Sequence, residues 1–417
     1  MNLETLARYL VGHRDAIESV ARSRWSVVIG LIFVLSAGLA REYDGEDLVH
    51  EPWHALRPLA ASLASGTALF ALVYGAAWAC NRRRQGEVAR PPLPRAYRSF
   101  MGLFWMTAPM AWLYAIPFER LLHPVDAVSA NLLLLAVVAA WRVLLMTRVV
   151  SVIYGIRLVP AFFLVMLFAD AVVFVAIVIV GAPVIDVMGG VRHSDREALL
   201  NGVKLMVMAL SLLSAPVWLI GSIAAAVTLK PRWLDLSPGV REGAPRGVIA
   251  VACCSVLAFV PLLLVTQREQ MNRREVERLI DANRFEEAFA EMSRRTPEDY
   301  PPGWDPPPHD WKMRSGLGWQ KMVAAMEASW PADWVARLYL AKLREFLVGH
   351  VLPQYRQEQA RLEWSTPDGE PDPGNAPGAW LTPQHRAAAR LLLERSDGLS
   401  PQDREDLELL VRLAPEK

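Results

Sequence analysis

Apolar residues form long blocks over roughly the first two thirds of the chain, and this pattern ends near residue 266. A helix needs about 20 mostly apolar residues to cross a bilayer core roughly 30 Å thick. Seven blocks reach or approach that length, and we predict a membrane-spanning helix in each: residues 25–40, 58–80, 97–117, 129–147, 158–180, 203–229 and 247–266. The predicted fold class is therefore all-α, a polytopic transmembrane bundle of residues 25–266 followed by a small all-α tail domain, residues 267–417.

The first block is the weakest of the seven. It holds 16 residues, which as a helix would be about 24 Å long. An apolar run of this length also occurs in signal peptides, and Gly38-Leu39-Ala40 would serve as a cleavage site. However, 24 residues precede the block, which is long for the polar start of a signal peptide. We therefore predict that it is retained as the first span.

Residues 1–24 carry a short amphipathic pattern. Leu3, Leu6 and Leu10 follow helical spacing, with polar positions such as Arg8 between them. A helix of this kind either lies on the cytoplasmic leaflet or packs as a cap on the bundle. The sequence leaves both possibilities open.

Basic residues in the loops indicate an orientation. If the N-terminus is cytoplasmic and the spans alternate, the inner segments 1–24, 81–98, 148–157 and 230–246 hold 16 Lys and Arg residues. The outer segments 41–57, 118–128 and 183–204 then hold 6. Cytoplasmic loops carry an excess of Lys and Arg, so this asymmetry favours a cytoplasmic N-terminus. Seven spans would then place the tail in the periplasm.

The tail changes in composition and predicts helices joined by proline-rich connections. Half of the thirty prolines lie beyond Gln267, clustered in residues 300–309 and 365–383. Thr382-Pro383 and Ser400-Pro401 are typical helix starts, and Asp403 lies three residues beyond the second cap. No run of residues reads as a strand. The seven tail tryptophans either fill a small core or form an exposed contact surface: Trp304, Trp311, Trp319, Trp330, Trp334, Trp364 and Trp380.

One tail segment, RLIDANRFEEAFAEM at residues 278–292, resembles the helical-hairpin turn of tetratricopeptide-type repeats. The resemblance rests on Leu279, Ile280, Phe285, Glu287 and Ala288, with Asn283 where that repeat prefers glycine. Only one copy is found, whereas repeat architectures need about three. We therefore predict a single α-hairpin here.

Composition and charge exclude several classes of protein. Hydrophobic residues make up 53% of the 417 residues and charged residues 21%, against about 45–50% and 25% in a soluble domain. A net charge of +1 argues against a nucleic-acid binder. Cys80, Cys253 and Cys254 all fall in or beside apolar blocks, so they do not form a disulfide framework.

The loop after the first block concentrates groups that could do chemistry. Seven ionisable side chains crowd into 13 residues: Glu42, Asp44, Glu46, Asp47, His50, Glu51 and His54. His50, Glu51 and His54 match the HExxH letters of zinc proteases, which need both histidines on one helix face. Pro52 is tolerated only near a helix start, so a helix containing it would leave His50 outside. We predict no catalytic zinc site; His50, Glu51, His54 and Asp47 remain candidates for an irregular metal site in the loop.

Two charged residues fall inside predicted spans, Arg142 in the fourth and Asp170 in the fifth. Ionisable residues are costly in a membrane and mark functional sites by default. We predict that they form a structural ion pair between the two spans. The alternative is that they belong to the pathway of a small-solute or ion transporter.

The segment REYDGEDLVHEPWHALRPLAASLASG, residues 41–66, resembles a group of uncharacterised bacterial polytopic membrane proteins. The resemblance implies a bacterial inner-membrane protein and implies nothing about activity.

The sequence as a whole predicts a non-catalytic membrane scaffold or accessory subunit. Its partners would be the lipid bilayer and proteins that bind the tail, without nucleic acid, cofactor or catalytic residues. A transporter that uses Arg142 and Asp170 is the alternative from another class. A membrane metalloprotease is a third and weaker hypothesis.

Overall fold

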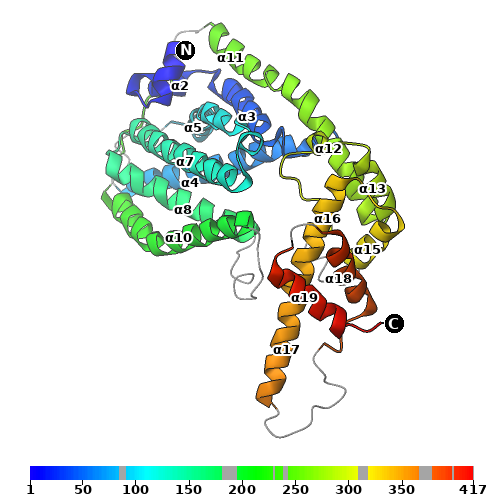
Figure 1. Cartoon of the computed structure of the whole chain (residues 1–417). Coiled ribbons are helices and arrows are strands. Elements are labelled where there is room, and N and C mark those ends of the chain that lie inside the picture. The colour runs from blue at the N-terminus through cyan, green and yellow to red at the C-terminus, as the bar shows by residue number, and fades with distance from the viewer. Residues whose placement is uncertain are drawn as a thin grey trace. The chain divides into compact units, whose positions relative to one another are not determined.

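In the computed structural model the described residues are mostly helical and contain no strand (Figure 1). These residues are 1–83, 91–180, 195–228, 231–237, 243–308, 318–365, 378–396 and 399–416. The all-α fold class predicted from the sequence is thus confirmed. The chain divides into two compact units, unit 1 (Met1–Gln267) and unit 2 (Arg268–Lys417).

Unit 1 contains long apolar helices. Its elements are α1 (Leu3–Leu10), α2 (Arg14–Arg22), α3 (Ser26–Glu42), the 3-10 helix η1 (Pro52–Leu56), α4 (Arg57–Arg83), α5 (Leu93–Trp105), the 3-10 helix η2 (Ala108–Ala115), α6 (Phe118–Leu121), α7 (Pro124–Tyr154), α8 (Leu158–Val180), α10 (Asp195–Thr228) and α11 (Arg246–Leu257). Helix α12 (Val260–Asp281) contains the division between the units.

Six helical stretches among the described residues are long and apolar enough to cross a membrane: Pro52–Asn81, Leu93–Leu121, Pro124–Tyr154, Leu158–Ile177, Leu199–Thr228 and Arg246–Asp281. They correspond to six of the seven predicted spans. The first predicted span becomes α3, which with 17 residues is about 26 Å long and too short by itself. Helix α3 reaches the length of a membrane span only when it is counted together with α2. The chain bends by 104° between these two helices, at residues 23–25. This pair is a broken span or a re-entrant segment.

Helix α3 is central to the core of unit 1 although it is the shortest predicted span. Ile29 and Phe33 are fully buried. A side chain added at Gly30 would meet Trp105 at 2.7 Å, and one at Gly102 would meet Ser26 at 2.4 Å. Glycine at these two positions therefore lets α3 and α5 approach closely.

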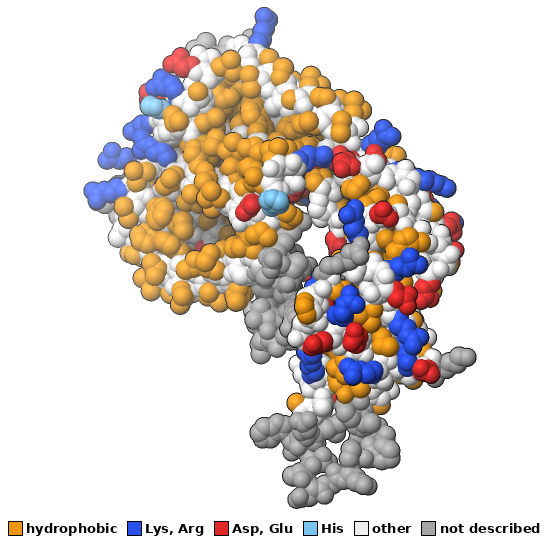
Figure 2. All heavy atoms as spheres, viewed as in Figure 1, with side chains coloured by type: hydrophobic (Ala, Val, Ile, Leu, Met, Phe, Trp, Pro, Cys, Tyr) orange, Lys and Arg blue, Asp and Glu red, His pale blue; other side chains and the backbone are white. Residues whose placement is uncertain are grey.

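Helices α7, α8 and α10 lie side by side (Figure 1). Each of them exposes large apolar side chains. On α10 these exposed residues are Leu205, Met206, Leu210, Leu212, Leu213, Val217, Leu219, Ile220, Ile223 and Val227. Figure 2 shows hydrophobic side chains covering much of the visible face of unit 1. This is the arrangement expected of helices whose solvent is lipid.

The N-terminal residues form two helices packed on the rest of unit 1. Leu6 and Tyr9 of α1 and Ile17 and Val20 of α2 are buried in its core. The Tyr9 hydroxyl donates a hydrogen bond to the carbonyl of Leu103 at 2.6 Å. Of the two possibilities that the sequence leaves open, these contacts favour an N-terminal cap packed on the bundle over a helix that lies on the membrane surface.

Unit 2 is built from shorter amphipathic helices. After the end of α12 it contains α13 (Phe285–Ser293), the 3-10 helix η3 (Pro297–Asp299), α15 (Gly318–Ala328), α16 (Asp333–Phe346), the π-helix η4 (Leu347–Val351), α17 (Leu352–Ser365), α18 (Pro383–Arg395) and α19 (Pro401–Leu413). Helices α18 and α19 begin at the predicted prolines, and each start carries a capping box. The predicted starts are confirmed.

Two helices joined by a tight turn lie where the sequence predicts an α-hairpin, at residues 278–292. Helix α12 ends at Asp281 and α13 begins at Phe285. Between them Asn283 adopts a left-handed conformation with φ of 60°. Asparagine tolerates this conformation better than most residues, which explains why it can replace the glycine of the repeat motif.

The tail tryptophans contribute mainly to the core of unit 2. Trp319 is 1% exposed, and Trp304, Trp334 and Trp380 pack against the same core. Trp330 is exposed and has the Arg395 guanidinium above its ring. The side chains of Trp311 and Trp364 lie outside the part of the chain that the structure describes.

Candidate functional site

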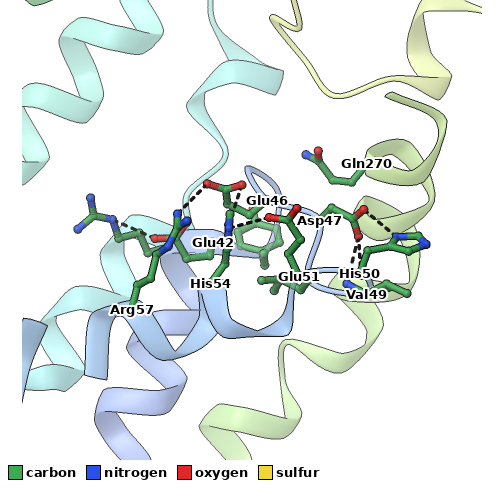
Figure 3. Close-up of polar contacts among 12 residues, drawn as sticks. Glu42, Glu46, Asp47, Val49, His50, Glu51, His54, Arg57 and Gln270 are labelled. Carbon is green, nitrogen blue, oxygen red and sulfur yellow. Dashed lines mark hydrogen bonds and ion pairs between the residues drawn. The ribbon is translucent and has the colours of Figure 1, made fainter. Parts of the chain in front are cut away.

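The histidine-rich loop between α3 and α4 folds into a cluster of ion pairs, which we call the loop cluster: Glu46, Glu51, His54 and Arg57 (Figure 3). Its shape follows from Pro52, where η1 begins, with Glu51 at the N-cap in non-helical geometry. His50 is therefore outside the helix, as the position of the proline predicts.

His54 is the buried centre of the loop cluster, and only 6% of it is exposed. Its Nε2 lies 2.9 Å from a Glu51 carboxylate oxygen, and its Nδ1 lies 2.9 Å from one of Glu46. The second contact is out of line for a directed hydrogen bond, so it is an ion pair.

His50 belongs to a separate turn. Its Nδ1 lies 2.8 Å from Asp47 Oδ2. Asp47 Oδ1 accepts hydrogen bonds from the backbone N–H groups of Val49 and His50. Figure 3 shows the two imidazoles on opposite sides of Glu51. The fold does not bring His50 and His54 to one metal-binding position.

Two residues near the start of α12 hold this loop in place. Gln267 Nε2 donates to the carbonyls of Tyr43 and Glu46, and its Oε1 accepts from the backbone N–H of Leu48 at 2.7 Å. Thr266 donates to the Tyr43 carbonyl at 2.6 Å. Both side chains are buried, so these bonds are shielded from water and join segments more than 200 residues apart in sequence.

The surroundings of the loop are acidic. Burial and the nearby Glu119 raise the pKa of Asp44. Burial also raises the pKa of the Tyr43 phenol to about 12, and its hydroxyl donates to the Ala115 carbonyl. Carboxylates of the loop and of Glu119 thus gather at one end of unit 1.

The described residues contain no group of three or more His, Cys, Asp and Glu side chains arranged to hold a metal ion. Both ring nitrogens of His54 already face carboxylates. The HExxH letters at His50, Glu51 and His54 therefore do not produce zinc-protease geometry here. The arrangement is suited to crosslinking a loop.

Arg142 on α7 stacks its guanidinium over the ring of Phe104, 4.5 Å from the centroid. Tyr9 and Tyr114 are its electrostatic neighbours. A guanidinium over an aromatic face gains about 2 kcal/mol or more when the pair is desolvated. Arg142 is thus held by aromatic groups of the α5 region and the N-terminal cap.

Asp170 on α8 has different partners. Its Oδ1 accepts a hydrogen bond from Ser211 at 2.6 Å and a weaker one from Ser214 at 3.5 Å. The Ser222 hydroxyl donates to the Phe163 carbonyl further along the same pair of helices. No ion pair joins Arg142 and Asp170 among the contacts of the described side chains; each charge has its own partners.

Sequence reasoning missed the residues that support these groups. Gln267, Thr266 and Ser211 are polar residues within or at the end of apolar blocks, and that position is the one signal that marks them. Which carboxylate or carbonyl each would meet depends on helix packing. The choice of Phe104 as the partner of Arg142 depends on packing in the same way.

Comparison of the chain with models of known protein families, with curated proteins and with solved structures finds no match.

Proposed function

We propose that this protein is a non-catalytic membrane scaffold in which unit 1 anchors the chain in a bilayer and unit 2 binds partner proteins. The observation that carries the proposal is the contrast in exposed apolar residues. Unit 1 exposes large hydrophobic side chains along all of its long helices, whereas in the described part of unit 2 they are Met271 and Trp330. The first surface is suited to lipid and the second to water.

Unit 2 supplies the type of surface that protein partners use. Its helices pack around one core, and α18 and α19 are the most closely paired of them. Trp330 projects at the turn before α16 and stacks with Arg395. Tryptophan and arginine are enriched at the centres of protein interfaces. We therefore place the partner contact at Trp330 and Arg395.

The proposed location is a bacterial inner membrane with a cytoplasmic N-terminus and a periplasmic unit 2. The asymmetry of 16 against 6 basic residues in the loops supports this orientation. The topology of unit 2 depends on α3. If α2 and α3 together cross the membrane, seven spans put unit 2 in the periplasm; if they form a re-entrant segment, six spans put it in the cytoplasm.

Two fusions test the topology. Alkaline phosphatase fused to the C-terminus should be active, and a green fluorescent protein fusion should be dark, because these reporters work only on opposite sides of the membrane. The reverse pattern would show that α3 does not cross.

A crosslinking experiment tests the scaffold. A photoreactive residue at position 330 of the full chain in native membranes should give a discrete heterologous adduct that disappears when Arg395→Ala is added. The same probe at Met271 serves as the control position on unit 2. Equal labelling at positions 330 and 271, or labelling insensitive to Arg395, would contradict the proposal.

A transporter is the second candidate, and the observation that favours it is Asp170. A carboxylate bonded to two serines between α8 and α10 is a polar site within apolar helices. In this case Asp170→Asn would abolish uptake of a solute or ion by reconstituted vesicles while leaving folded yield near wild type. If the wild type transports nothing and Asp170→Asn lowers the folded yield, the role of Asp170 is structural.

A further inference from the structure

Helices α8 and α10 gather several oxygen atoms around Asp170. The Ser211 hydroxyl lies 2.6 Å from Asp170 Oδ1 and 3.3 Å from the Asp170 carbonyl oxygen. The Ser214 hydroxyl lies 3.5 Å from the same Oδ1 and 3.3 Å from the Ser211 carbonyl oxygen. Side-chain and backbone oxygens from both helices thus meet at one place.

The Asp170 carboxylate lacks a compensating positive charge. Asp170 lies 12 residues after Leu158, about 18 Å along α8, near the middle of a stretch long enough to cross a membrane. Within the described residues it forms no ion pair, and its Oδ2 accepts no hydrogen bond. The other ionisable residue in the apolar stretches of α8 and α10 is Lys204, seven positions before Ser211. An uncompensated carboxylate is costly at such a position, so the site favours a bound cation.

The spacing of the oxygens matches the coordination shell of an ion. Three of the four separations are 3.3–3.5 Å, longer than the roughly 2.7–2.8 Å of a typical O–H···O hydrogen bond. Two ligands at right angles around a cation stand about 1.4 bond lengths apart, so bonds of about 2.3–2.6 Å give about 3.3–3.7 Å. Bonds of this length are typical of Ca²⁺ and of Na⁺, which is similar in size. A single carboxylate balances the charge of Na⁺.

Pro216 adds a further oxygen to the same turn of α10. It lies inside the helix and has no N–H to donate to the Leu212 carbonyl, four residues earlier. Leu212 lies between Ser211 and Ser214 in the sequence. Backbone carbonyls that lack a helical donor coordinate Na⁺ inside membrane proteins.

The site is shielded on one side and accessible on the other. Ser211 is only 5% exposed, whereas Asp170 and Ser214 are half-buried. Further along the two helices a side chain added at Gly221 would meet Phe163 at 2.2 Å, so α8 and α10 approach closely there. The close packing holds the ligands in place, and the half-buried carboxylate leaves an ion a way in.

We propose that Asp170, Ser211 and Ser214 bind one Na⁺ between α8 and α10. The carboxylate supplies the counter-charge and the hydroxyls supply neutral ligands, which suits a hard monovalent cation. A proton would also neutralise Asp170, but it would not account for oxygens spaced 3.3–3.5 Å apart. This inference names an ion for the polar site of the transporter candidate. It depends neither on transport nor on the scaffold function, because binding is measured on the purified chain without a partner.

The test is a scintillation proximity assay with radioactive Na⁺ on the full chain purified in a neutral detergent, with choline chloride holding the ionic strength constant. Wild type should bind about one Na⁺ per chain, displaced by unlabelled Na⁺ and much less by equal K⁺. Asp170→Asn should abolish binding. Ser211→Ala and Ser214→Ala, which each remove one ligand, should weaken it by about tenfold.

Ser222→Ala is the matched control. The Ser222 hydroxyl lies between the same two helices but donates to the Phe163 carbonyl, so this variant should bind Na⁺ like wild type. If Asp170→Asn is not monodisperse, the two serine variants carry the test. Absence of saturable Na⁺ binding, equal displacement by K⁺, or an equal loss in Ser222→Ala would each overturn the proposal. A wild-type melting temperature that responds to acid but not to Na⁺ would assign the site to a proton instead.

Discussion

Units 1 and 2 use the same apolar residue types in opposite ways. In unit 1 the long helices bury one face and leave large hydrophobic residues such as Leu213 and Leu264 about three-quarters exposed. In unit 2 the apolar faces of shorter helices converge on one core that includes Trp319 and Tyr339. The hydropathy of a helix therefore indicates whether its surroundings are apolar or aqueous. It does not indicate whether the helix is buried inside the protein.

The same lesson holds within unit 1. The stretch Leu93–Leu121 is the least apolar of the six candidate spans, and 56% of its apolar window is buried. The stretch Leu199–Thr228 is more apolar, and only 6% of its window is buried. Helices inside a bundle pack through small and polar residues, whereas those at its edge carry leucine and valine toward lipid.

The largest effect is expected in the core of unit 2. Trp319→Ala removes a fully buried side chain that packs against the rings of His385 and Phe346, and should destabilise unit 2 by about 3–5 kcal/mol. Hydrogen exchange of the full chain should then show loss of protection confined to residues 268–417. Trp330→Ala, an exposed tryptophan, should cost about 1 kcal/mol or less. Equal losses from the two variants would contradict the assignment of the core.

In unit 1 the closest helix contact should be the most sensitive. Gly102→Leu places a side chain on Ser26 at the α3–α5 contact and should destabilise unit 1 by about 3 kcal/mol. Folded yield in detergent, measured by size-exclusion chromatography, should fall severalfold. Gly75→Leu is the control because its new side chain meets open space. A normal yield for Gly102→Leu would mean that α3 does not pack on α5 as described.

A charge placed on the exposed apolar face of unit 1 tests the proposed lipid environment. Leu213→Asp should impair membrane insertion by about 2.5–3.5 kcal/mol, read as a reduced membrane-integrated fraction after carbonate extraction. Met271→Asp on unit 2 should change this fraction very little. If Leu213→Asp is tolerated as well as Met271→Asp, the exposed face of α10 does not meet lipid.

Acid should weaken unit 2 through His385. Burial lowers the pKa of this imidazole to about 4, and Thr382 donates its backbone N–H to Nδ1. The unfolded chain binds a proton near pH 6.5 and the folded chain only near pH 4. The unfolding free energy therefore falls as pH drops from 6.5 to 4, by at most about 3 kcal/mol, and is unaffected above that window.

The pH dependence can be measured as hydrogen-exchange protection of α18 in the full chain at pH 7 and pH 4.5. His385→Gln should reduce the difference between the two values, whereas His350→Gln should preserve it. A His385→Gln variant with the full wild-type loss would assign the acid sensitivity to other groups.

The smallest effect concerns Arg142 and Asp170. With separate partners for each charge, the losses in unfolding free energy caused by Arg142→Ala and Asp170→Ala should add within about 0.5 kcal/mol in the double variant. Chemical denaturation of the purified variants in mixed micelles measures this. A double variant more stable than the sum by over 1 kcal/mol would instead support the ion pair predicted from the sequence.

Local residue chemistry determined much of the helical content. Pro383, Pro401 and the Ser400–Asp403 cap mark helix starts because the N-cap needs a hydrogen-bond acceptor and the first turn accepts proline. Pro52 determined that His50 lies outside the helix of His54. Block length determined six of the candidate spans, because the bilayer thickness sets the number of residues that a helix needs.

The tertiary structure decided which polar groups meet. The sequence shows that Arg142 and Asp170 are costly inside apolar helices, but helix rotation decides that Phe104 and Ser211 are their partners. Gln267 reaches a loop more than 200 residues earlier because α11, the helix before α12, packs beside α3. Contacts between distant segments depend on the relative placement of whole helices, and spacing along one helix does not encode that placement.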